Sequence, residues 1–367
     1  MTEALRDIIS NYDLNGRVIR ATPLGKGLIN CTLHIMTENG NDRGSYVLQR
    51  INKQVFKNPH ELMENYAAVT AFLREKIQKM GGNPRRETIS IIQTRDGGNY
   101  CIDTNGDCWR MITYITDSVC YDRVESPQQL YDSAVAFGRF QRLLSDYPAE
   151  ALYETIPNFH NTPHRFSQLT EAVKADICGR ASEVRDEIAF VRGREAFAHT
   201  LENAHREGRL PLRVTHNDTK LSNILFDAKS GEALCIIDLD TVMPGYSVND
   251  FGDAIRACAT TAAEDEGDIS KVSFDLSLYE LYVKGFIKGA GDSLTDGERE
   301  LLPVGAIMMT YECGMRFLTD YLSGDVYFKT EREKQNLHRA RNHFKLVSDM
   351  EQNLEKMQEI VNKYFHK

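Results

Sequence analysis

Two stretches of the chain carry polar residues at a spacing that few folds use. The first, Thr215-His216-Asn217-Asp218-Thr219-Lys220-Leu221-Ser222-Asn223, places a Lys two residues and an Asn five residues after an Asp. The second, Cys235-Ile236-Ile237-Asp238, ends an apolar run with another Asp, twenty residues after the first. Phosphoryl transfer uses such groups: one Asp accepts the proton of the attacking hydroxyl, and an Asn and a second Asp hold Mg²⁺ on the nucleotide phosphates. The spacing predicts Asp218 and Lys220 as catalytic residues, and Asn223 and Asp238 as metal ligands.

Single residues of this pattern have simpler explanations. Asp218 alone would fit a helix cap or a turn, but four matching residues weaken that interpretation. His216 is assigned to packing and hydrogen bonding of the loop. Asp240 is either a second metal contact or a carboxylate bonded to backbone amides, and we favour the second because one Asp and one Asn suffice for Mg²⁺. Asp253, in Asp250-Phe251-Gly252-Asp253, is expected to cap or anchor the catalytic loop from a helix start.

The periodicity of apolar residues changes near residue 114. Before it the sequence predicts mainly strands, and after it mainly helices. The predicted strands cover 18–24, 31–36, 46–51, 89–92, 99–102 and 109–114, with one helix over 62–79. The later helices cover 127–144, 165–178, 183–203, 276–289, 298–322 and 331–364, with strands at 224–226 and 234–237. We therefore expect an α+β, bilobal, protein-kinase-like fold, with a small antiparallel-sheet nucleotide-binding lobe over 1–114 and a larger helical catalytic lobe over 115–367.

The expected nucleotide lobe departs from the usual kinase pattern. Gly25 and Gly27 form a degenerate glycine loop, which is assigned to the nucleotide phosphates although a Gly-x-Gly between strands is often only a hairpin. The strand lysine that would point at the phosphates is missing, and Gln49 stands in its place. Either Gln49 does a weaker job by hydrogen bonding to the nucleotide, or a Lys or Arg from elsewhere supplies the charge.

Composition limits the classes of function. A net charge of −9 argues against a nucleic-acid partner, because no excess of positive charge exists to replace phosphate counterions. The polar N-terminus lacks the apolar core of a signal peptide, and no apolar run is long enough for a membrane span. Eight Cys without a Cys-x-x-Cys pair predict reduced thiols in a cytoplasmic protein. The amphipathic stripe of the last helix favours packing within the chain, hence a monomer, over dimerisation.

Further segments of the sequence resemble those of a known enzyme family. Arg213 to Leu225, together with 236–245, 159–166 and Glu312-Cys313-Gly314-Met315-Arg316-Phe317-Leu318, resembles N-acetylhexosamine 1-kinases of the aminoglycoside phosphotransferase and choline kinase superfamily. The resemblance implies transfer from ATP, with Mg²⁺, to N-acetylglucosamine or N-acetylgalactosamine, giving the sugar 1-phosphate. It also implies the roles given above for Asp218, Asn223 and Asp238.

The same resemblance implies Arg316 and Tyr327 as sugar-binding residues, and Asn30 as a residue that reaches the sugar or the phosphates. From the residues alone, Arg316 in its apolar stretch is better explained by a salt bridge to a core carboxylate. His160 and His164 are four apart, but Pro163 between them disfavours a helical metal site. Leu28 departs from family members that carry His there.

Two alternatives stay open. The first is another small-alcohol kinase of the superfamily, acting on choline, homoserine or a plain hexose. The second is a catalytically silent protein that binds a nucleotide or a sugar. The expected partners are a small-molecule sugar and ATP, with no nucleic acid and no membrane.

Overall fold

The computed structural model describes residues 2–24 and 31–365. The chain divides into two compact units. Unit 1 comprises Met1–Cys120, Asp146–Pro157 and Asn223–Met243, and unit 2 comprises Tyr121–Ser145, Asn158–Ser222 and Pro244–Lys367. The functional boundary predicted near residue 114 stays a prediction.

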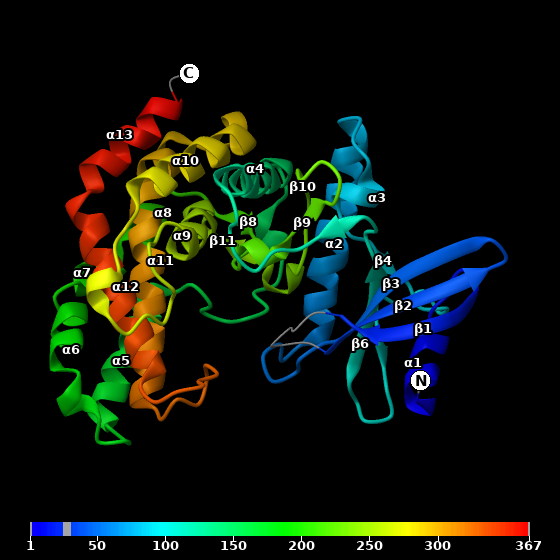
Figure 1. Ribbon diagram of the computed structural model, residues 1–367, viewed down its shortest axis with the longest axis horizontal. Helices are drawn as coiled ribbons and strands as arrows, with labels where there is room; N and C mark the ends of the chain where they lie inside the picture. Colours follow the sequence, from blue (N-terminus) through cyan, green and yellow to red (C-terminus); the bar gives the residue numbers. More distant parts are fainter. Residues whose placement is uncertain (1, 25–30, 366–367) are drawn as a thin grey trace. The chain divides into compact units, whose positions relative to one another are not determined.

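The first part of unit 1 is built on an antiparallel sheet (Figure 1, blue and cyan). Its strands are β1 (Arg17–Pro23), β2 (Cys31–Asn39), β3 (Asp42–Arg50), β4 (Ile91–Ile92), β5 (Cys101–Ile102) and β6 (Cys108–Thr113). The order is β1-β2-β3-β6-β4, with β5 also paired to β6. The predicted antiparallel N-terminal sheet is confirmed.

Three helices accompany this sheet: α1 (Glu3–Ser10), α2 (Pro59–Lys79) and α3 (Pro84–Glu87). The core beneath α1 is a cluster that includes Ile9, Tyr12, Leu48 and Trp109. Tyr12 donates its hydroxyl hydrogen to the carbonyl of Trp109 at 2.6 Å, which satisfies a polar atom that burial would otherwise leave unpaired. Helix α2 begins where Asn58 accepts a hydrogen bond from the backbone of Glu61, as an N-cap does.

A second, three-stranded sheet in unit 1 consists of β7 (Ser118–Val119), β9 (Ile224–Asp227) and β10 (Ala233–Ile236), in the order β10-β9-β7. Strands β9 and β10 form a hairpin, in which Ile236 lies opposite Ile224. One step further, the amide of Ile237 donates to the carbonyl of Asn223 at 2.9 Å. The residues before β9 and after β10 therefore lie at the same end of the hairpin.

Unit 2 is helical, as the sequence predicts (Figure 1, green to red). Its α-helices are α4 (Pro127–Leu143), α5 (Thr162–Ala175), α6 (Arg185–Arg192), α7 (Glu195–Ala198), α8 (Thr200–Arg206), α9 (Ser247–Cys258), α10 (Leu276–Ala290), α11 (Asp296–Leu322), α12 (Gln335–Gln352) and α13 (Leu354–Phe365). The short strands β8 (Arg213–Thr215) and β11 (Met243–Gly245) pair with each other.

Two predicted helices are interrupted. The helix expected over 183–203 is three short helices, broken near Gly193 and at His199. The helix expected over 331–364 starts at Gln335 and breaks at Asn353, whose side chain donates to the carbonyl of Asp349. The apolar stripe continues across this break because both helices bury that face, so periodicity alone could not reveal it.

Glycines set the closest helix contacts of unit 2. At the α9–α11 crossing, a Cβ added to Gly252 would lie 2.3 Å from the carbonyl oxygen of Gly305. At the α4–α10 crossing, a Cβ on Gly138 would lie 2.2 Å from the carbonyl oxygen of Phe286. These backbones approach to distances that any side chain would prevent.

Within the described residues, no helix is both long and apolar enough to cross a bilayer. The seven cysteines whose side chains are described form no disulfide bond.

Candidate functional site

The predicted catalytic loop is held by the helix that follows it. Strand β8 ends at Thr215, and Asn217 takes a left-handed conformation with φ of 63°. The amides of His216 and Asn217 donate to the buried carboxylate of Asp250, at 2.8 and 2.7 Å. Asp250 lies in the first turn of α9, so that turn fixes the direction in which the chain approaches Asp218.

Asp253 holds the next part of the loop. Its carboxylate accepts a hydrogen bond from the amide of Thr219 at 3.0 Å. On the other side it binds the guanidinium of Arg256 through two hydrogen bonds, at 3.0 and 2.7 Å. Burial raises the pKa of the Asp253 carboxyl, but Arg256 and His160 lower it further, so the net pKa lies below its usual value. Asp253 thus contacts the loop as expected, but from the middle of α9 and not from a helix start. Its role as an anchor stays a prediction.

His216 lies inside unit 2 and not at its surface. Its ring meets those of Phe137 and Phe140 edge-on, with centroids 5.7 and 5.8 Å away. Its Nδ1 accepts a hydrogen bond from the amide of Asp218 at 3.3 Å. Packing and hydrogen bonding of the loop therefore account for this residue.

The two predicted catalytic residues contact each other. Lys220 donates from Nζ to Oδ2 of Asp218 at 2.7 Å, and both side chains are partly exposed. The pair places a carboxylate next to a cation, and the catalytic roles of both residues stay predictions.

Glu312, for which the sequence predicts no role, also belongs to the surroundings of the catalytic loop. Oε1 of Glu312 binds Nδ1 of His160 at 2.8 Å, and Oε2 accepts from the hydroxyl of Thr162 at 2.7 Å. Nε2 of His160 reaches the carbonyl of Asn217 at 3.2 Å. The chain of contacts therefore ends at the peptide bond that precedes Asp218. An acidic residue amid the apolar residues of a long helix was the available signal.

Burial would raise the pKa of the Glu312 carboxyl, but the hydrogen bond and charge of His160 and the charge of Arg316 lower it more. The net pKa therefore lies below its usual value, which favours the carboxylate form. His160 thus acts in a hydrogen-bonded network, and the described structure shows no metal arrangement with His164, whose amide instead caps α5 through Asn161.

Arg316 lies half-buried on α11, next to that network. Its guanidinium carbon is 5.5 Å from the ring centre of Phe159 and 5.6 Å from that of Phe328. Among the described residues it forms no ion pair and no hydrogen bond. The salt bridge expected from the residues alone is therefore wrong for the described residues, and this cation lies near two aromatic rings.

The loop after α11 carries Tyr327 and Phe328, and its backbone is hydrogen-bonded to Asp320. The carboxylate of Asp320 accepts from the amides of Val326, Tyr327 and Phe328, at 3.0, 2.8 and 2.9 Å. The ring of Tyr327 packs edge-on against Phe328 and is otherwise largely exposed.

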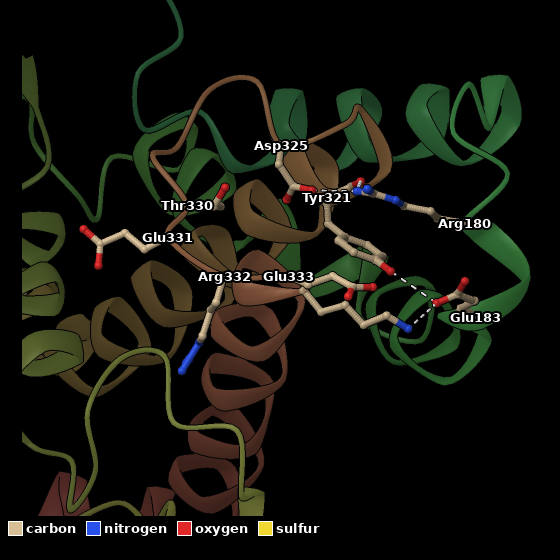
Figure 2. Close-up of a pocket in the computed structure, with 9 residues that line it drawn as sticks. Arg180, Glu183, Tyr321, Asp325, Thr330, Glu331, Arg332 and Glu333 are labelled. Atoms are coloured by element: carbon tan, nitrogen blue, oxygen red, sulfur yellow. Dashed lines mark hydrogen bonds and ion pairs between the residues drawn. The ribbon is translucent and has the colours of Figure 1, made fainter.

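Residues at and after the end of α11 line a surface cavity of about 470 Å³, together with Arg180 and Glu183 (Figure 2). In its wall Arg180 binds Asp325 at 2.7 Å, and Tyr321 donates to Glu183 at 3.2 Å. Because these groups already pair with one another, we assign the residues that line the cavity to support of the loop.

The predicted metal ligands belong to unit 1. Asn223 precedes β9 and Asp238 follows β10, so the hairpin brings both to one end. Asp238 adopts a left-handed conformation with φ of 60°, which a non-glycine residue takes at a cost. An amide oxygen and a carboxylate are the donor types that Mg²⁺ prefers, so the residues fit this ion. The metal assignment stays a prediction.

Two other predicted residues of unit 1 contact each other through Arg110. Asp240 forms an ion pair with Arg110, whose side chain is 0% exposed, and Gln49 accepts two hydrogen bonds from the same guanidinium. Asp240 is therefore paired with an arginine from β6, and its expected contacts with backbone amides stay a prediction. Gly25, Gly27 and Asn30 lie outside the described residues.

A third group of potential ligands sits behind the loop anchor. Glu264, Cys313 and His343 bring ligand atoms within 4.8 Å of one another. Arg256 donates to Glu264 at 3.0 Å and lies 3.5 Å from Nε2 of His343. A guanidinium thus already supplies the positive charge there, and we assign the cluster to holding Arg256 against Asp253.

Comparison with known proteins places this geometry in a family. The sequence profile described as "Phosphotransferase enzyme family" matches residues 20–278. The fold is similar to that of an aminoglycoside phosphotransferase from Alicyclobacillus acidocaldarius, with a TM-score of 0.65 at 13% identity over 98% of this chain and 96% of that one.

It is also similar to a microcompartment-associated aminopropanol kinase (TM-score 0.55, 14% identity, 96% and 98% covered). A choline kinase from Cryptosporidium parvum Iowa II has a TM-score of 0.52 at 11% identity, over 95% and 93% of the two chains. At these identities the likenesses concern the fold.

The profile match covers well over half of the chain and includes both motifs. The chain therefore belongs to the phosphotransferase enzyme family, and its reaction class is phosphoryl transfer.

Proposed function

We propose that this protein is an anomeric kinase of N-acetylhexosamines, which converts N-acetylglucosamine or N-acetylgalactosamine and ATP into the sugar 1-phosphate and ADP. The observation that carries the proposal is the surrounding of Arg316. A half-buried guanidinium that has no ion pair among the described residues offers hydrogen-bond donors to neutral oxygens. The nearby rings of Phe159, Tyr327 and Phe328 suit the apolar faces of a sugar.

The charges near Arg316 favour a neutral acceptor over an amine. Arg165 lies close enough that Arg316 lowers the pKa of its guanidinium, after the larger effect of burial. The neighbouring carboxylate, Glu312, is fully buried and already accepts from His160 and Thr162. A choline-like cation would therefore meet two arginines, and the aromatic rings that could surround it face a guanidinium instead. This argues against the choline-kinase alternative.

In the proposed reaction Asp218 orients the anomeric hydroxyl and takes its proton as the oxygen bonds to the γ-phosphorus. The bond between that phosphorus and the β–γ bridging oxygen breaks, and ADP leaves with the electron pair. Lys220 stabilises the transferring group, exchanging its contact with Asp218 for the phosphoryl oxygens. Asn223 and Asp238 would hold Mg²⁺, which draws negative charge from the β- and γ-phosphates when it is bound.

The roles proposed for the two parts of the chain follow the boundary predicted from the sequence. We propose that residues 1–114 bind the nucleotide and that residues 115–367 carry catalysis and sugar binding. Asp250, Asp253 and His160 act by fixing the backbone on either side of Asp218.

The deciding experiment is an ADP-release assay with N-acetylglucosamine, N-acetylgalactosamine, glucose, choline, ethanolamine and homoserine. We expect turnover with the two N-acetylhexosamines, and a ³¹P spectrum of the product that shows phosphate on the anomeric oxygen. Turnover confined to an amine would refute the proposal. No sugar- or alcohol-dependent ADP release at all would favour the catalytically silent alternative.

Two variants connect the assay to the site. Asp218→Asn should bind ATP normally but lose roughly 10²–10⁴-fold in turnover, as removal of a general base does. Arg316→Met should raise KM for the sugar with little change in KM for ATP, and Arg316→Lys should recover part of the loss. An unchanged sugar KM in Arg316→Met would remove Arg316 from the acceptor site.

A further inference from the structure

Arg110 is a fully buried cation at the centre of unit 1. Its side chain is 0% exposed, and that of its ion-pair partner, Asp240, is 5% exposed. Burying an unpaired charge costs several kcal/mol, so an arginine at this position needs close compensation. Burial lowers the pKa of the Arg110 guanidinium, but Asp240 and Tyr66 raise it more, and the net pKa lies above its usual value.

Gln49 aims this guanidinium. In the pairing of β3 with β6, Gln49 lies directly opposite Arg110. Its Oε1 accepts from Nε and Nη2 of Arg110 at 3.0 and 2.9 Å, while its Nε2 donates to the hydroxyl of Thr32 at 3.3 Å. Both ends of the Gln49 amide are therefore engaged in unit 1. The position where a kinase would carry its strand lysine holds a support for an arginine.

Helix α2 also contacts Arg110 and the segment after β10. The ring of Tyr66 lies 4.4 Å below the guanidinium of Arg110, a cation–π distance. Its neighbour Asn65 donates to the carbonyl of Val242 at 3.3 Å. Arg110 and Asn65 thus hold the segment after β10 at two points, Asp240 and Val242, just beyond the left-handed Asp238.

We infer that Arg110, aimed by Gln49, is a positioning residue for the metal ligand Asp238. Two carboxylates stand two residues apart in this turn, and the charge of Arg110 offsets that of Asp240. With Asp240 paired to Arg110, we assign the divalent cation to the carboxylate of Asp238. In this proposal Arg110 replaces part of the function of the missing strand lysine. It fixes the turn that holds Asp238 and does not contact the phosphates. This inference rests on the proposed role of Asp238.

The competing possibility is that Asp240 is itself a metal ligand. The ion pair opposes it, because Oδ1 of Asp240 already binds Arg110, and a metal on the same carboxylate would lie close to the positive charge of a fully buried guanidinium. The two possibilities differ in what happens when the pair is replaced by neutral residues of similar volume.

The test measures binding of Mn²⁺ by electron paramagnetic resonance, on the full chain in the presence of the non-hydrolysable nucleotide AMP-PNP. The main variant is Arg110→Met/Asp240→Leu, which removes both charges together and spares the fold an uncompensated ion. We expect Mn²⁺ affinity to fall by about 10–100-fold, the usual effect of losing a group that orients a metal ligand. Arg110→Lys should lie between the wild type and this variant, because it keeps the charge but not the fork.

Arg86→Met is the matched control. It breaks another ion pair of unit 1, with Asp227 at 2.9 Å, and should leave Mn²⁺ affinity unchanged. If the double variant does not fold, as judged by circular dichroism, Gln49→Leu replaces it. That variant removes two hydrogen bonds to Arg110 and should weaken Mn²⁺ binding several-fold.

The outcomes separate the claims. Wild-type Mn²⁺ affinity in the folded double variant, or in Gln49→Leu when the double variant is unfolded, would overturn the role of Arg110. Abolished binding in the double variant together with normal binding in Arg110→Lys and Gln49→Leu would make Asp240 a ligand, which also overturns it. Wild-type affinity in Asp238→Asn would instead refute the proposed function's assignment of Asp238.

Discussion

Replacing Gly252 by Ala should disturb both the stability and the chemistry of this protein. The added Cβ would lie 2.3 Å from the carbonyl oxygen of Gly305, 2.6 Å from its carbonyl carbon and 2.8 Å from Cγ of Met309. Two of these atoms are backbone of α11, so no side-chain rotation relieves the contact. Helices α9 and α11 would have to separate by about 1 Å to restore ordinary van der Waals distance.

The expected cost follows from two opposing effects. Overpacking of a filled interior costs about 1–3 kcal/mol, and contacts against backbone belong at the upper end. Alanine in a helix interior returns about 1 kcal/mol relative to glycine. The net loss in the free energy of unfolding should therefore be about 2 kcal/mol.

The chemistry should suffer as well, because Gly252 stands between Asp250 and Asp253. Both carboxylates hold amides of the catalytic loop. A displacement of about 1 Å at such a site can cost around 10²-fold in rate, so turnover should fall by roughly 10–100-fold at a temperature where the variant is folded.

Urea unfolding and the ADP-release assay measure these two effects. The control is Gly193→Ala, at a helical φ of −63° where the added Cβ approaches other atoms no closer than 3.4 Å. It should leave turnover unchanged and stability equal or higher. A Gly252→Ala protein as stable as the wild type would refute the packing argument, and a destabilised one with normal turnover would refute the role of α9 as the loop's anchor.

Three further predictions concern single side chains of unit 2. Burial lowers the pKa of His343 to about 4, against about 6.5 when unfolded, so its stabilising effect is complete above pH 6.5 and is lost as the pH falls towards 4. Going from pH 7 to pH 5 should therefore cost the wild type about 2 kcal/mol more in unfolding free energy than it costs His343→Gln, and equal pH dependences would contradict this. Glu312→Gln should lower the unfolding free energy at pH 7 by about 2 kcal/mol and reduce turnover, because His160 loses a charged partner. Unchanged values of both would show that the network contributes to neither stability nor turnover. Asp320→Asn should raise KM for the sugar but not for ATP, since it loosens the loop of Tyr327, and steady-state kinetics with each substrate varied would reveal the opposite pattern if the loop served the nucleotide.

Local patterns in the sequence predicted much of this protein. The change from strand to helix periodicity near residue 114 gave the antiparallel sheet and the helical part, because side-chain periodicity reflects burial within each element. Where helices break without losing their apolar face, as at Asn353, the same signal could not find the interruption.

Long-range partners were not predictable in this way. Gln49 was visible as the residue in the lysine's place, but nothing in the sequence pointed to Arg110, sixty-one residues later, as its partner. Glu312 and His160 are separated by 152 residues and meet only through the packing of unit 2.

The sequence by itself determined the reaction class, because Asp218, Lys220, Asn223 and Asp238 lie in one loop and one hairpin whose spacing is local. The tertiary structure decided which charges are compensated. It paired Asp240 with Arg110 and Glu312 with His160, and it left Arg316 without an ion pair among the described residues. Compensation of a buried charge depends on which distant elements pack against it, and a linear pattern of residues carries no record of that packing.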